Sequence, residues 1–136
     1  MKVEELRLVV DSLALIQPLS DRIAESFYEH LFEVAPHTRR LFTGDMERQG
    51  AMLMTSLSLA VNGLSNMDET QPAIQALGER HYSYGVKLEH YAPAVESFLW
   101  ALEHHLAENF TPALKDAWRA AFQALTEEMK KVYDSQ

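Results

Sequence analysis

The chain of 136 residues contains no cysteine. Disulfide bonds, thiolate metal sites and cysteine nucleophiles are therefore excluded. Any metal ion that the protein binds must be held by histidine, methionine or carboxylate side chains. The six histidines are the first of these to consider.

Long hydrophobic runs are also missing. Apolar stretches are only a few residues long, as in SFLWAL at 97–102, whereas a membrane-spanning helix needs about 20 apolar residues. The N-terminal segment does not resemble a secretory leader, because charged residues interrupt it: Glu4, Glu5, Arg7 and Asp11. We therefore expect a cytoplasmic protein without a membrane partner.

Basic residues are scarce as well. The chain has 12 Lys and Arg against 20 Asp and Glu, a net charge of −8, and the basic residues are dispersed. Nucleic-acid-binding proteins typically carry a clustered basic surface, so no nucleic-acid partner is expected. Hydrophobic residues (47%) and charged residues (24%) are in the range of folded proteins, and the length is that of one domain. A single domain over 1–136 is expected.

What the sequence does contain is helical periodicity. Apolar residues recur on one helix face within 3–16, within 46–66 and in later segments, and no strand pattern is present. Prolines and glycines separate these segments, and Pro72 is expected in the first turn of a helix at 70–82. The sequence predicts one all-α domain of about seven helices. The short helices at 36–42 and 70–82 argue against a symmetric four-helix bundle.

His81 is the first candidate for chemistry. It follows Ile74 and Leu77 at the end of an apolar helical stripe. Most histidines in such positions are packed and hydrogen-bonded, so the ligand interpretation requires partners elsewhere in the chain. Gln49 interrupts an otherwise apolar helix face, and Tyr28 lies next to Phe27. Taken singly, each of these side chains is best explained by packing.

The order and spacing of the motifs change this interpretation. The chain contains FYEHLF with Tyr28, then RLF ending at Phe42, then Gln49 with Leu53, then LGERHYSYGV with His81, and finally FTP and AW. Over nearly its full length it resembles a three-over-three globin, most closely the single-domain bacterial haemoglobins and the haem domain of flavohaemoglobins. The expected fold is therefore a globin sandwich of helices around a haem pocket.

The resemblance implies a cofactor site for haem b. It makes His81 the proximal iron ligand, as is usual in globins. The Leu77 carbonyl would accept a hydrogen bond from the other ring nitrogen and so orient the imidazole. Phe42 would wedge the porphyrin. The other cofactor-binding residues implied are Leu53, Val86 and Tyr91.

On the distal side, no histidine lies between His37 and His81. The resemblance places Tyr28 and Gln49 there, in a pocket lined by Leu53. A phenol and an amide can both donate hydrogen bonds to a diatomic ligand. High affinity and slow release of O2 follow as expectations, with NO and CO as further ligands.

The resemblance also suggests a reaction, the oxidation of NO to nitrate by O2. Flavohaemoglobins have their own reductase module, so this chain would need an external reductase. In that family a tyrosine and a glutamate flank the proximal histidine. Tyr91 matches the tyrosine, but Tyr133 stands where the glutamate is expected, which favours ligand binding over rapid redox chemistry.

Two alternatives remain open. The chain could be a haem-based gas sensor, or a globin-fold interaction module that has lost haem. The five other histidines are expected to be exposed rather than to bind metal: His30, His37, His90, His104 and His105.

Overall fold

Six α-helices joined by short turns form the fold in the computed structural model, which describes residues 1–135. The helices are α1 (Val3–Ile16), α2 (Ser20–Val34), α3 (Met46–Gly63), α4 (Met67–Ser83), α5 (Tyr91–Leu106) and α6 (Pro112–Lys131). The predicted short helix at 36–42 is the 3-10 helix η2 (Pro36–Leu41). The predicted all-α fold is confirmed.

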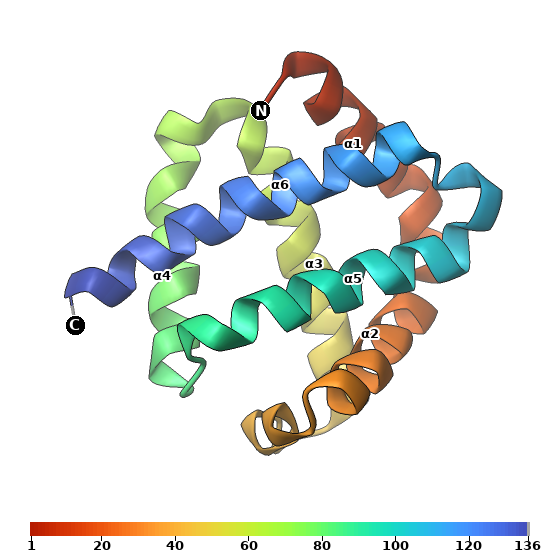
Figure 1. Cartoon of the computed structure of the whole chain (residues 1–136). Helices are drawn as coiled ribbons and strands as arrows, with labels where there is room; N and C mark the ends of the chain where they lie inside the picture. The colour runs from red at the N-terminus through yellow and green to blue at the C-terminus, as the bar shows by residue number, and fades with distance from the viewer. Residues whose placement is uncertain (136) are drawn as a thin grey trace.

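The helices form two layers. α1, α3 and α4 pack against α2, α5 and α6, with the main contacts between α4 and α6, α1 and α6, and α2 and α3. Figure 1 shows α6 passing in front of α4 and α5 passing in front of α3. Within the described residues, no helix is both long enough and apolar enough to span a bilayer.

The start of α4 differs from the prediction. α4 begins at Met67, so Pro72 is the sixth residue of the helix rather than a residue of its first turn. Because proline has no N–H, Pro72 cannot donate the hydrogen bond that the Asp68 carbonyl would otherwise accept. Compared with the predicted start at residue 70, α4 begins about one turn earlier.

The core centres on Trp118 of α6, which is fully buried. Its indole N–H donates to the Ser12 hydroxyl at 2.9 Å, and that hydroxyl donates to the Val9 carbonyl at 2.7 Å. Such a chain satisfies the polar atoms that burial removes from water. It ties α6 to α1.

A second contact fixes α4 against α6. Gly78 is buried, and a Cβ atom at this position would lie 2.5 Å from the Met129 carbonyl oxygen and 2.8 Å from its Cα. A backbone cannot yield as a flexible side chain can, so only glycine allows this approach. The contact sets the position of the last turn of α4.

We predict that Gly78→Ala destabilises the protein by about 1–3 kcal/mol, because the overpacking cost exceeds the gain in helix propensity. Urea unfolding measures the change. Gly44→Ala is the matched control, since its new Cβ meets only the end of the Gln49 side chain at 3.3 Å. The control is expected to stay within about 0.5 kcal/mol. A stabilised Gly78→Ala variant would refute the close-approach argument.

Candidate functional site

His81 lies in the last turn of α4, three residues after Gly78. Its Nδ1 atom is 2.8 Å from the Leu77 carbonyl oxygen. A carbonyl can only accept, so Nδ1 carries the proton and Nε2 is left as the basic nitrogen of a neutral ring. Burial lowers the pKa of His81, and the charge of Arg80 lowers it further, against the hydrogen bond to Leu77. The ring is therefore a neutral, oriented donor of one nitrogen lone pair.

Tyr91 lies beside this imidazole, with ring centroids 6.2 Å apart. Its hydroxyl donates to the Tyr133 hydroxyl at 3.1 Å, and Tyr133 donates to the Val86 carbonyl at 2.7 Å. Burial, the first cause, and the bond to Tyr133 raise the pKa of Tyr91. The structure thus joins Tyr91 to Tyr133 rather than to the His81 ring nitrogen.

No carboxylate takes part in this chain of hydrogen bonds. Glu128 accepts from Lys131 at 2.6 Å and from the Gln71 amide at 3.0 Å, and Glu127 accepts from Gln123 at 3.4 Å. Both carboxylates are therefore engaged elsewhere: Glu128 joins α6 to Gln71 and Gln75 of α4, and Glu127 pairs with Gln123 along α6. The hydrogen-bond chain itself is uncharged, and the charged group near Tyr91 is a cation, because Lys130 Nζ lies 5.3 Å from the centre of its ring.

The turn after α4 requires a glycine. Gly85 has φ of +92°, a left-handed conformation that residues with a Cβ rarely adopt. Next to it, the Val86 N–H donates to the His81 carbonyl at 3.0 Å. A Cβ at Gly85 would lie 3.7 Å from Leu41 Cδ2, so this turn meets the end of η2. The residue after Leu41 is Phe42, which brings the Phe42 and Val86 segments close together.

Tyr28 of α2 is almost completely buried, with 7% of its surface exposed. Its ring packs edge-on against Phe42 at 5.1 Å and Phe27 at 5.0 Å and stacks on Phe32 at 5.9 Å. Burial raises the pKa of Tyr28 to about 12, so the phenol keeps its proton. Among residues 1–135 its hydroxyl has no hydrogen-bond partner. The hydroxyl oxygen itself keeps some solvent access, because no fully buried side-chain donor or acceptor of the described residues lacks a partner.

Gln49 and Leu53 lie on α3 and are both partly buried. A Cβ at Gly44 would lie 3.3 Å from Gln49 Nε2, so the amide is turned toward the loop before α3. Within the described chain, this amide makes no hydrogen bond to Tyr28. Tyr28 and Gln49, the two residues predicted for the distal side, thus lie on neighbouring helices without being joined to each other.

These residues fit a haem by their chemistry. His81 offers one free basic nitrogen, and Tyr28 offers one hydroxyl donor without a hydrogen-bond partner among the described residues. The apolar side chains among them are all only partly buried: Phe42, Leu53, Leu77 and Val86. Partly exposed apolar groups around two polar atoms that have no protein partner are what a planar apolar ligand with a central metal would complete.

Sequence reasoning was wrong about several of the other histidines. His90 is buried, and its Nδ1 accepts from the Lys87 N–H at 3.0 Å. His30 is bonded to Ser97 at 2.9 Å, and His105 is bonded to Ser26 at 2.7 Å, so both join α2 to α5.

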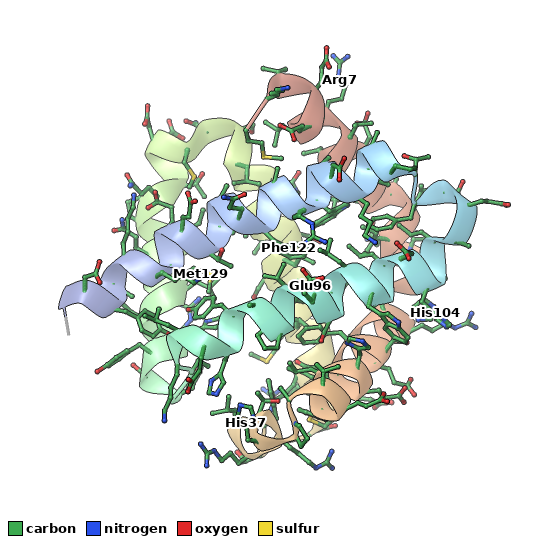
Figure 2. The ribbon with its side chains drawn as sticks, in the orientation of Figure 1. Arg7, His37, Glu96, His104, Phe122 and Met129 are labelled. Carbon is green, nitrogen blue, oxygen red and sulfur yellow. The ribbon has the colours of Figure 1, made fainter. Side chains whose placement is uncertain are left out.

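The expectation of exposure holds for the remaining two histidines, His37 and His104, which Figure 2 shows at the periphery. Among the described residues, no cluster of three or more His, Asp or Glu side chains could hold a metal ion. The charged residues next to His90 in the sequence gave no indication that its side chain is buried.

Comparisons with known proteins identify the family to which the fold belongs. The Globin family model matches residues 25–129. An uncharacterised globin-like protein of Aquifex aeolicus is 28% identical over 96% of this chain and 95% of its own length. A flavohemoprotein of Vibrio cholerae is 20% identical over 88% of this chain, which spans only 31% of that protein.

Two solved structures have the same fold. A bacterial globin of Campylobacter jejuni is 22% identical, with a TM-score of 0.81 over 98% of this chain and 99% of its own. An engineered carbene transferase from Rhodothermus marinus is 28% identical, with a TM-score of 0.85 over 99% of this chain and 97% of its own. With the family model covering most of its length, the chain belongs to the globin family.

Proposed function

We propose that the chain binds haem b through His81 and uses it to bind O2, NO and CO. The observation that carries the proposal is the bond from His81 Nδ1 to the Leu77 carbonyl, which leaves Nε2 unprotonated and oriented. The haem would supply an iron atom as the site of ligand binding. Membership of the globin family supports the same cofactor.

The chain's own residues would hold the cofactor by apolar contact. Phe42, Leu53, Leu77 and Val86 would contact its faces and edge. Each of them packs on the core with one side and is partly exposed on the other. Burying an apolar side chain fully contributes roughly 1.5–3 kcal/mol, so four half-exposed groups give a substantial driving force for haem uptake. Tyr91 would support the proximal side through its position beside His81.

The carboxylates of haem b require cations at the edge of the site. Lys87 follows Val86 directly, and Arg40 precedes Phe42 by two residues. Both are exposed, which suits groups that keep their charge in water. We assign them this role of charge balance.

On the distal side, Tyr28 and Gln49 would donate hydrogen bonds to the diatomic ligand. Tyr28 is protonated, because burial raises its pKa to about 12, and its hydroxyl has no other partner within residues 1–135. A hydrogen bond to a charged or strongly polarised acceptor contributes about 1.5–3 kcal/mol. Slow ligand release is therefore expected.

The same site supports oxidation of NO by O2 as a possible activity, with electrons from an external reductase. The Rhodothermus marinus protein is an engineered form of a candidate nitric oxide dioxygenase, and flavohemoproteins are among the relatives. The hydrogen bonds from Tyr91 to Tyr133 and from Tyr133 to Val86 involve no carboxylate, which favours ligand binding as the main role. A gas sensor or a haem-free interaction module is the alternative, favoured if the protein takes up no hemin.

His81→Ala is expected to weaken haem binding by more than about a hundredfold, since even residues that only orient a metal ligand contribute 10- to 100-fold. Hemin titration followed by Soret absorbance measures this. His104→Ala, at an exposed histidine, is the control and should bind hemin like the wild type. Circular dichroism shows whether both variants are folded. A folded His81→Ala protein with unchanged affinity would refute the ligand assignment.

Tyr28→Phe is expected to accelerate O2 release by roughly ten- to a hundredfold, because the phenolic donor is lost while the ring remains. Stopped-flow displacement of O2 by CO measures the rate. Tyr84→Phe is the matched control, since it makes the same change at a tyrosine that is 70% exposed. It should leave the rate within about twofold. An unchanged rate in Tyr28→Phe would remove Tyr28 from the distal site.

Tyr133→Glu is expected to lower the iron reduction potential by roughly tens of millivolts, because a carboxylate beside Tyr91 favours the ferric state. Spectroelectrochemistry at pH 8 measures the shift. Tyr82→Glu is the control: its ring packs edge-on against Tyr133 at 5.2 Å, but it is 44% exposed. If Tyr133→Glu and Tyr82→Glu gave the same shift, the special role of the Tyr91–Tyr133 bond would be contradicted.

A further inference from the structure

A groove of about 690 Å³ lies between α2 and α3, on the side of these helices that carries their charged residues. Figure 1 shows α2 lying beside the lower part of α3, near the bottom of the view. Its floor consists of small, aromatic and thioether side chains: Ala24, Tyr28, Phe32, Met46, Gly50 and Ala51. The only one of these that belongs to the proposed distal site is Tyr28.

The groove exists because its floor has so few side-chain atoms. Ala24, Gly50 and Ala51 have no atom beyond Cβ. A Cβ at Gly50 would lie 3.1 Å from the Ala24 Cβ and 4.0 Å from Tyr28 Cε2. The backbones of α2 and α3 therefore lie close together beside the edge of the Tyr28 ring.

Tyr28 forms the wall between this groove and the distal side. Its ring lines the groove and also packs edge-on against Phe42, 5.1 Å away. Its hydroxyl makes no hydrogen bond to any residue in the described chain, so only packing against other rings holds it in place. Such a ring can turn without breaking a hydrogen bond. A ligand that accepts a bond from the hydroxyl would hold the ring still.

The rim of the groove is strongly acidic. Asp21, Glu25 and Glu29 follow one another at four-residue spacing along α2, and Glu47 faces them from α3. With Arg39, the basic residue among the lining groups, the formal charge is −4 plus 1, or −3. Such a field repels anions and leaves neutral diatomic molecules unaffected.

We infer that the groove is an entry vestibule for neutral diatomic gases, with Tyr28 as the gate to the distal side. The inference rests on the proposed function, because it assumes that the gas binds beyond Tyr28. A bound ligand closes the gate through its hydrogen bond with Tyr28, so entry and retention depend on the same side chain. The acidic rim lowers the association rate of anions such as azide.

Ala51→Phe tests the route. Ala51 is exposed on α3, so the new ring fills the groove without entering the core. The association rate of CO after flash photolysis is expected to fall about tenfold, an added barrier of ~1.4 kcal/mol. Leu59→Phe, at a position 69% exposed on the same helix, is the control and should match the wild type. Equal CO rates in all three proteins, with the Soret band intact, would overturn the entry route.

The rim is tested by neutralising its carboxylates in one variant: Asp21→Asn, Glu25→Gln, Glu29→Gln and Glu47→Gln. At low ionic strength, azide association with the ferric protein should rise at least about threefold, while CO association stays the same. An unchanged azide rate would overturn the exclusion of anions.

Xenon tests the groove without relying on haem. Under xenon pressure, the backbone amides of Tyr28, Gly50 and Ala51 should shift in 15N-resolved NMR spectra of the protein as purified, and the shifts should vanish in Ala51→Phe. Absent shifts in the wild type would overturn the vestibule. If the shifts appear but the protein takes up no hemin, the missing uptake contradicts the proposed function, while the shifts still support the gas site.

Discussion

The approach of Gly78 to the Met129 backbone is the constraint on which the site depends. It allows α4 to lie against α6 with no side chain between them. His81 follows one turn later, and its tilt is set by the bond to Leu77, the residue just before Gly78. The same helix contact therefore positions the imidazole relative to Tyr91 and Tyr133, whose elements flank it. A metal ligand gains affinity when its orientation is fixed before binding.

The two sides of the site are built differently. On the α4 side, polar atoms are paired: His81 with Leu77, Tyr91 with Tyr133, and Tyr133 with Val86. On the α2 side, the Tyr28 hydroxyl has no hydrogen-bond partner within the described residues, and its oxygen keeps some solvent access. Pairing gives rigidity, while a donor without a protein partner is free to bond to a ligand. The first side suits a permanent cofactor, and the second suits a ligand that comes and goes.

Much of this could be predicted from the sequence. Helical stripes and prolines gave the all-α class, and the ordered motifs around Tyr28, Phe42 and His81 pointed to a globin, as the family model confirms. The position expected of Tyr133 from that resemblance agrees with its bond to Tyr91.

Other features could not be predicted, because they depend on tertiary contacts that leave no local pattern. A lone glycine inside a helix, Gly78, does not reveal which backbone it meets. The polar character of His90 gave no sign of its burial, and Asp68 and Thr70 indicated a helix start that the structure places at Met67.

The most direct test of the central claim is a hemin titration of the purified chain, followed by absorption spectra of the ferric, ferrous and CO-bound forms. Our account predicts saturable uptake of one haem per chain, a ferrous form ligated by a single histidine, and a CO complex that forms on the open Tyr28 side. A chain that takes up no hemin, or a ferrous spectrum with both axial positions filled by side chains, would contradict it.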